Sequence, residues 1–282
     1  MILKIKNENK VSTHLISTVR PKSPVFQLPE YQNRPKVSFC ITHKNRFHQI
    51  AETLTKNLND NRIDEGRVEF ILVDFGSDHD MKNWVADQFS AEISSEYLKF
   101  FHTNKLEKWH APIAKNTAHR LSTGQILVNL DGDNFTGYRG GQFVYEHFME
   151  NQHDICCWQF SGRNGDGSFG RIASARDTFF GIGGYNEELL EMGFQDRDLV
   201  RRLEMSGVKV VLALDESYNH TLENDQYEPK EMAYASMRLF NKKIAKRIVK
   251  KDNLKANGNT MGIQSGIKQL VITNGKISMI DV

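Results

Sequence analysis

Short apolar runs alternate with amphipathic stretches through the first half of the chain. The apolar runs are rich in β-branched and aromatic residues, as is typical of buried strands, whereas the stretches between them carry apolar residues at helical spacing. The predicted strands are 37–42, 68–73, 98–101 and 125–130, and the predicted helices are 46–58, 80–90 and 113–123. Strands that alternate with helices indicate an α/β fold built on a parallel sheet.

The second half of the chain is less regular. A glycine-rich loop is predicted at 162–170, a helix within 189–205 and a further strand at 208–214. Residues 231–251 predict a basic amphipathic helix, and the last stretch, 255–282, is compatible with a small strand pair.

Composition narrows the class of protein only slightly. Hydrophobic residues make up 39% of the chain, charged residues 26%, and the net charge is +2 at pH 7, which gives no large field that would attract a polyanion. The three cysteines, Cys40 and the adjacent pair Cys156 and Cys157, form a poor disulfide framework and favour free thiols. Without a signal-peptide pattern or an apolar run of about 20 residues, we expect a cytoplasmic protein with no transmembrane segment.

Carboxylates follow two of the predicted strands. Asp74 comes after the strand at 68–73, and Asp131-Gly132-Asp133 comes after the strand at 125–130. Ligands of parallel sheets bind beyond the carboxyl ends of the strands, where Asp74 could accept hydrogen bonds from a ribose or a base. Asp131 and Asp133 can converge on a hard cation, Mn²⁺ or Mg²⁺, that bridges phosphates. Taken alone, such a short acidic motif is more often a polar turn.

The order of these residues along the chain favours the metal-site interpretation. Lys115 and Asn116 lie where the predicted helix before the Asp131 strand begins, and a helix N-terminus with a lysine favours an anion. A strand-end carboxylate, an anion-binding helix start and a second acidic strand end therefore follow one another in the sequence.

Six segments resemble the family 2 glycosyltransferases and related GT-A enzymes over roughly residues 36–225. In chain order they are VSFCIT at 37–42 with Asn45-Arg46, FILVDFGS at 70–77, AKNTA at 114–118, GQILVNLDGDN at 124–134, FGIGGYNE at 180–187 and GFQDRDL at 193–199. The resemblance implies a GT-A fold, a Rossmann-like mixed α/β sheet flanked by helices. It divides the chain into an N-terminal arm at 1–35, a catalytic domain at 36–225 with donor half 36–135 and acceptor half 136–225, and a helical, basic C-terminal extension at 226–282.

The resemblance also implies roles on the donor side. The residues expected to bind the nucleotide-sugar are Thr42, Arg46 and Asp74 at the nucleoside, Lys115 and Asn116 near the nucleotide, and Asp131 at the ribose or metal. Asp133 is the expected direct metal ligand. His220, after the strand at 208–214, is a further candidate ligand or, equally, a surface loop histidine.

On the acceptor side, Gly183 and Gly184 lie in a segment that resembles the family's Gly-Gly-Phe-Asp-Glu motif. Asp196 matches the general base of inverting members. Gln195 stands where the family has a glutamate, so it could hydrogen-bond an acceptor but could not serve as a base. For Asp196 and for Asp198 the alternative is capping of the following helix, which we favour for Asp198.

The implied activity is metal-dependent transfer of a sugar from a nucleotide-sugar, most often a UDP-sugar, to an acceptor hydroxyl. The acceptor stays open among a glycan, a lipid-linked glycan, a protein, a small molecule and DNA, and the oligomeric state is open too. A nucleotidyltransferase would share the layout, but it should carry a glycine-rich basic loop after the first strand, and residues 42–46 contain no glycine.

A non-catalytic glycan- or nucleic-acid-binding module is the second alternative. Its support is a crowded set of basic residues, Lys242, Lys243, Lys246, Arg247, Lys250 and Lys251. The same stretch could instead touch an anionic lipid surface or hold a phosphorylated or DNA acceptor, or it could be a solvated helix face.

Overall fold

The computed structural model describes residues 37–151, 155–162, 167–222, 234–250, 254–258 and 260–282. The predicted N-terminal arm and part of the glycine-rich loop lie outside the described residues. No helix among these residues combines the length and the apolar character needed to cross a membrane.

The centre of the molecule is one nine-stranded mixed sheet in the order β7-β5-β6-β4-β1-β2-β3-β8-β9. Its strands are β1 Val37–His43, β2 Val68–Asp74, β3 Leu98–His102, β4 Ile126–Asp131, β5 Ile155–Trp158, β6 Ile172–Ala175, β7 Lys209–Leu212, β8 Lys268–Thr273 and β9 Lys276–Asp281. The four strands predicted in the first half form the parallel part, because β4, β1, β2 and β3 pair in parallel.

The second half of the chain makes the sheet mixed, because β6 runs antiparallel to both β4 and β5. Within the described residues, only the single-turn 3-10 helix η2, Ser168–Gly170, lies between β5 and β6. A parallel return would require a crossover connection, usually a helix, whereas an antiparallel return needs none. The mixed sheet that the family resemblance implies is therefore confirmed.

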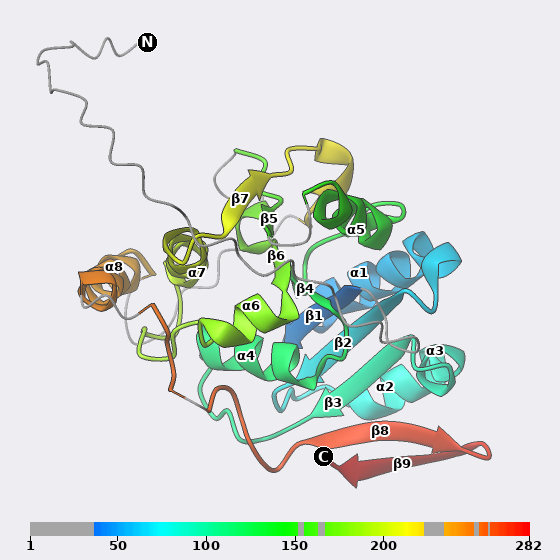
Figure 1. Cartoon of the computed structure of the whole chain (residues 1–282). Coiled ribbons are helices and arrows are strands. Elements are labelled where there is room, and N and C mark those ends of the chain that lie inside the picture. Colours follow the sequence, from blue (N-terminus) through cyan, green and yellow to red (C-terminus); the bar gives the residue numbers. More distant parts are fainter. Residues whose placement is uncertain (1–36, 152–154, 163–166, 223–233, 251–253, 259) are drawn as a thin grey trace, which may run out of the picture.

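Helices cover both faces of the sheet (Figure 1). They are α1 Phe47–Asp60, α2 Met81–Gln88, α3 Ser90–Ser94, α4 Ala111–Leu121, α5 Gly140–Glu150, α6 Arg176–Gly181, α7 Gln195–Met205 and α8 Tyr234–Lys250, with short 3-10 helices η1 Arg62–Asp64 and η3 Glu216–Tyr218. Alternate residues of β1 enter different cores. Phe39 and Ile41 pack with α1, α2 and α5, whereas Cys40 packs with α4. Burial on both faces explains why the parallel strands read as continuous apolar runs.

Helix α4 begins two residues before the predicted start. The side chain of His110 accepts the backbone N–H of Ile113, and Pro112 stands in the first turn, where its missing N–H costs no intrahelical bond. This start places Lys115 in the second turn rather than at the helix N-terminus.

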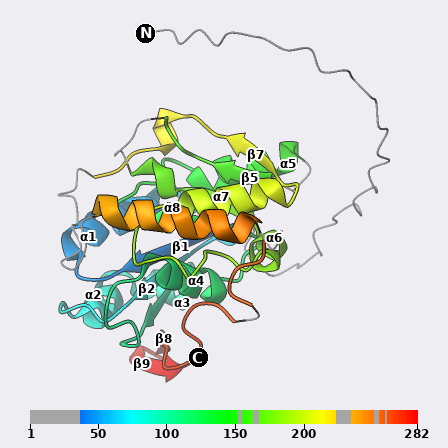
Figure 2. The same ribbon diagram turned by 90° about the vertical axis from the view of Figure 1, so that its left-hand side faces the viewer.

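The C-terminal part completes the sheet and one face of the molecule. The predicted strand pair is confirmed as the β8–β9 hairpin, which adds to the edge at β3. The predicted basic helix is also confirmed as α8, which packs against α7 and lies across the outside of the molecule (Figure 2).

Candidate active site

Strand register brings the predicted donor-side residues to one edge of the sheet. Thr42 of β1 is the partner of Asp131 in β4. The next residue of β1, His43, is the partner of Asp74 in β2, and Asp74 pairs in turn with His102 of β3. Because parallel strands end at the same edge, residues far apart in sequence form one row beyond their carboxyl ends.

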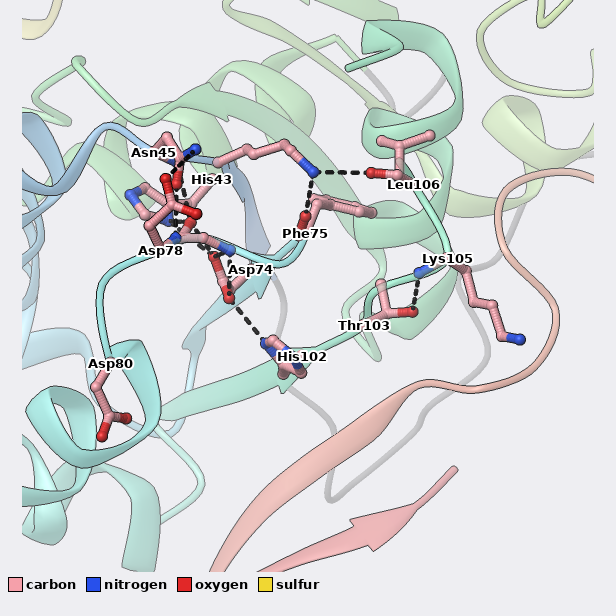
Figure 3. Close-up of polar contacts among 12 residues, drawn as sticks. His43, Asn45, Asp74, Phe75, Asp78, Asp80, His102, Thr103, Lys105 and Leu106 are labelled. Carbon is pink, nitrogen blue, oxygen red and sulfur yellow. Dashed lines mark hydrogen bonds and ion pairs between the residues drawn. The ribbon is translucent and has the colours of Figure 1, made fainter. Parts of the chain in front are cut away.

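Asp74 is buried at this edge, and its carboxylate is held by its neighbours (Figure 3). Nδ1 of His43 lies 3.1 Å from one carboxylate oxygen, and Nδ1 of His102 lies 2.8 Å from the other. The hydroxyl of Ser77 donates a further hydrogen bond. Burial by itself would raise the pKa of Asp74, but the bonds from His102, His43 and Ser77 outweigh it and hold that pKa well below its ordinary value. Asp74 is therefore an ionised carboxylate with hydrogen-bond partners on both oxygens.

The loops after β1 and β2 are tied to each other beside Asp74 (Figure 3). The backbone N–H of Asp78 donates to the Asn45 side-chain oxygen at 2.7 Å, and the Asn45 amide donates to the Asp78 carboxylate at 3.1 Å. Lys44 Nζ donates to the carbonyls of Phe75 and Leu106 at 2.8 and 2.9 Å. These bonds fix the segment that leads to Arg46, the residue just before α1.

Asp131 and Asp133 form a concentrated negative charge at the end of β4. The side chain of Asp131 is 32% exposed. The hydroxyl of Thr53 donates a hydrogen bond to the carbonyl oxygen of Gly132 at 2.7 Å. Burial, and then the charge of Asp131, raise the pKa of Asp133, while Asn134 and the positive charge of Arg46 lower it. Two neighbouring carboxylates offer oxygen ligands to a hard divalent cation, so these residues fit Mn²⁺ or Mg²⁺.

His220 lies on the segment that pairs with the Asp131–Asp133 turn. Asn134 and Thr221 form an isolated antiparallel bridge, and the backbone carbonyl of His220 accepts the N–H of Phe135 at 2.9 Å. The buried guanidinium of Arg171 links the two segments, because it donates to the Asn134 side chain at 2.7 Å and to the His220 carbonyl at 3.1 Å. The His220 ring is exposed. Across the described residues, no three His, Cys, Asp or Glu side chains form a ready-made metal cluster.

Lys115 connects the donor side of the site to the acceptor side. Its ammonium lies 3.2 Å from a carboxylate oxygen of Asp131 and 3.0 Å from one of Asp196, and it also stands over the ring of Tyr185. Burial opposes the charged form, but Asp131 and then Asp196 raise the pKa of Lys115 well above its ordinary value. The sequence predicted an anion partner for Lys115, and in this structure the anions are two of the other predicted site residues.

Asp196 is buried in the first turn of α7 behind Lys115. Its second oxygen accepts a hydrogen bond from the Gln195 side chain at 3.1 Å. Burial is the largest cause that raises the pKa of Asp196, and Asp131 adds to it, whereas Lys115 counteracts both. The Gln195 side-chain oxygen is buried and has no hydrogen-bond partner among the described residues.

The predicted capping role of Asp198 is wrong. Helix α7 starts after Phe194, and its N-cap position makes no side-chain hydrogen bond. Asp198 instead pairs with Arg202, one turn later, at 2.8 Å, and both side chains are buried. The spacing of four residues is that of a helical ion pair, and it is already visible in the sequence.

Asn116, Gly183 and Gly184 build the turn behind this centre. The buried Asn116 amide donates to the Tyr185 carbonyl at 2.7 Å and to Glu187 at 2.8 Å, and its oxygen accepts the Tyr185 N–H at 2.8 Å. Gly183 has a positive φ of 74°, and a Cβ there would lie 1.9 Å from the Ala256 carbonyl oxygen, so only glycine fits. Their expected contacts with donor and acceptor stay predictions.

Two of the residues that organise the site were not found from the sequence. His43 and His102 have no motif of their own, and their role depends on the pairing of β1, β2 and β3. Their position in the sequence could have indicated this role, because each histidine directly follows the last residue of a predicted apolar strand.

Comparison with known proteins places the chain in one family. The model of a family described as "Glycosyl transferase family 2" matches residues 38–249. No protein with a curated function matches the sequence.

Several solved structures share the fold at low sequence identity. The mannosyltransferase PcManGT from Pyrobaculum calidifontis, in complex with GDP-Man and Mn²⁺, is 18% identical, with a TM-score of 0.57 over 80% of this chain and 67% of that one. TarS 1-349 of S. aureus with UDP-GlcNAc is 15% identical, with a TM-score of 0.55 over 68% and 60%.

GalNAc-T7 with UDP, GalNAc and Mn²⁺ is 14% identical, with a TM-score of 0.51 over 64% and 43%. The chain thus spans about two thirds or less of the length of each of these proteins. The mixed sheet flanked by helices is the GT-A fold.

Substitution of Asp74 by asparagine tests whether Asp74 is an ionised carboxylate held by His43, His102 and Ser77. We expect Asp74→Asn to lower the free energy of unfolding at pH 7 by about 2–3 kcal/mol, because hydrogen bonds to a charged group are lost. The folded-state pKa of Asp74 is lowered, so its contribution is complete above the unfolded value of about 3.9 and is lost as the pH falls below it. Urea unfolding from pH 7 to pH 3 should show the difference between the two proteins shrinking below about pH 4. Asp87→Asn, at an exposed position of α2, is the control, and a pH-independent difference for Asp74→Asn would contradict the assignment.

Proposed function

Because the chain belongs to glycosyl transferase family 2 and is a glycosyltransferase, we propose that it transfers a sugar, with inversion and with a divalent metal ion, to an acceptor hydroxyl. The observation that supports this proposal most is the position of Lys115 between Asp131 and Asp196. Asp131, in the proposed metal-binding turn, and Asp196, the proposed base, are 65 residues apart in sequence. Both contact the buried ammonium of Lys115.

The donor lies along the carboxyl edge of the parallel strands in this proposal. Thr42, Arg46 and Asp74 adjoin the nucleoside. His102 is half-buried, so its ring can meet the base while Asp74 stays covered. A UDP-sugar is the donor that the family resemblance favours, and GDP-Man, which PcManGT carries, is the other donor to test.

Asp133 and Asp131 would hold Mn²⁺ or Mg²⁺, with His220 as a further ligand from the adjoining segment. Such an ion stabilises the negative charge of a departing nucleoside diphosphate. Arg46 provides a positive charge of the protein itself on the same side of the site.

Asp196 is the proposed general base. It takes the proton of the acceptor hydroxyl while that oxygen bonds to the anomeric carbon and the bond to the diphosphate breaks. Its raised pKa makes it a stronger base, and Lys115 favours the ionised form that a base requires. A carboxylate has lone pairs beyond those used by Lys115 and Gln195, so it can still accept the hydroxyl proton.

The cellular location belongs to the same proposal. All three cysteines are buried free thiols, which agrees with the expected cytoplasmic location.

Removal of the Asp133 carboxylate tests the metal assignment. In a calorimetric titration with UDP and Mn²⁺, we expect Asp133→Ala to weaken binding at least about tenfold, because even groups that only support metal ligands contribute that much. The matched control is Asp87→Ala, an exposed carboxylate on α2 that should bind as the unmodified protein does. Equal affinity of Asp133→Ala and the control, in the presence and absence of Mn²⁺, would remove Asp133 from the metal site.

Substitution of Asp196 by asparagine tests the base. A panel of nucleotide-sugars with Mn²⁺ identifies the donor by slow hydrolysis, in which water replaces the acceptor. We then expect Asp196→Asn to keep donor affinity within about threefold and to slow hydrolysis by about 10²–10⁴-fold, the usual contribution of a general base. Asp177→Asn, on the exposed side of α6, is the control. Unchanged hydrolysis by Asp196→Asn would place the base elsewhere, and hydrolysis of no donor would refute the proposed function.

A further inference from the structure

Helix α8 presents a basic surface that also carries exposed apolar side chains. Five basic side chains of the helix are exposed, namely Arg238, Lys242, Lys243, Lys246 and Arg247. The helix sequence contains no Asp or Glu, and within the described residues none of these five side chains forms an ion pair. Leu239 is 63% exposed and Phe240 is 51% exposed. We call these seven residues the α8 surface.

The α8 surface is a fixed part of the protein. The opposite side of the helix is buried through Met237, Asn241 and Ala245. The Asn241 side chain accepts the N–H of Leu190 at 2.7 Å and donates to the carbonyl of Gly193 at 2.7 Å. Asn241 therefore holds the loop that leads into Gln195 and Asp196, and α8 lies next to α7, the helix that carries these two residues (Figure 2).

Helical spacing mixes the two kinds of side chain on that outward face. Leu239, Lys243 and Lys246 are spaced by four and three residues, so they lie in one row, and Phe240 lies beside that row, one turn before Lys243. Basic side chains therefore adjoin both apolar ones. Isolated exposed apolar residues are common on protein surfaces, but an exposed leucine and phenylalanine beside five cations on one helix form the pattern of an interfacial amphipathic helix.

We propose that the α8 surface docks the protein on an anionic lipid bilayer. Lysine and arginine on an amphipathic helix bind anionic headgroups, and Leu and Phe insert at the boundary between headgroups and acyl chains. A nucleic acid would attract the same charges, but its phosphates offer nothing to the two exposed apolar side chains. Charge complementarity and the exposed apolar pair together favour the bilayer. The proposal does not depend on the sugar-transfer chemistry.

Flotation of the full-length protein with vesicles tests this docking. We expect binding to vesicles of phosphatidylcholine mixed with phosphatidylglycerol, little binding to phosphatidylcholine alone, and weaker binding as salt is raised. The variant Lys242→Gln/Lys243→Gln/Lys246→Gln should lose about fivefold in partition for each charge removed. The variant Leu239→Ser/Phe240→Ser should lose about tenfold, because apolar area no longer enters the interface.

Two matched controls separate docking from general charge or hydrophobicity. Lys82→Gln/Lys268→Gln/Lys276→Gln removes three exposed lysines from α2 and the β8–β9 hairpin, and Ile63→Ser/Ile277→Ser removes two exposed apolar residues remote from α8. Both should bind as the unmodified protein does. No binding to anionic vesicles would overturn the proposal. A second result would also overturn it. In that result the lysine variant loses affinity for duplex DNA, and Leu239→Ser/Phe240→Ser binds both duplex DNA and anionic vesicles as the unmodified protein does.

Discussion

The buried ammonium of Lys115 is the interaction on which the candidate site depends. Asp131 and Asp196 come from different elements, and the charge of Asp131 adds to the burial that raises the pKa of Asp196. A buried carboxylate such as Asp196, close to a second negative charge, stays ionised at lower cost when a positive charge lies between the two. Lys115 supplies that charge at 3.2 and 3.0 Å, and so links the end of β4 to the start of α7.

The surroundings of Lys115 are built to keep this arrangement in place. Asn129 donates to both Asp131 and the carbonyl of Gly170, and a Cβ at Gly170 would lie 2.4 Å from the Asp131 carboxylate. On the other side, the fully hydrogen-bonded amide of Asn116 holds the turn at Tyr185. Fixed polar groups of this kind are what an enzyme uses to stabilise charge that develops during a reaction. Helix α8 is linked to this site, because Asn241 of α8 donates a hydrogen bond to the loop just before Asp196.

The pattern of apolar residues in the sequence was sufficient to predict the four parallel strands, β1 to β4. The runs that became β1, β2, β3 and β4 are apolar on both faces, and the position of Asp74 and Asp131 after two of them placed both at one edge. The antiparallel strand β6 was not predicted, because its sequence, Ile-Ala-Ser-Ala, contains one β-branched residue and no run of large apolar side chains. The Asp198–Arg202 pair was readable at its spacing of four but was assigned to capping. His43 and His102 could not be assigned to Asp74, since that contact depends on strand register, which no local pattern specifies.

The central claim, that Lys115 and Asp196 form a coupled buried ion pair beside Asp131, is tested most directly by a double-mutant cycle. Lys115→Met and Asp196→Asn are combined, and the free energies of unfolding of the four proteins are measured in urea. Each single substitution should cost about 3 kcal/mol, and the double substitution should cost less than the sum by at least about 1 kcal/mol, because removal of both partners leaves no unpaired charge between them. A parallel cycle of Lys115→Met with Asp198→Asn, whose partner is Arg202, should be additive. Additivity within about 0.5 kcal/mol in the first cycle would contradict the account.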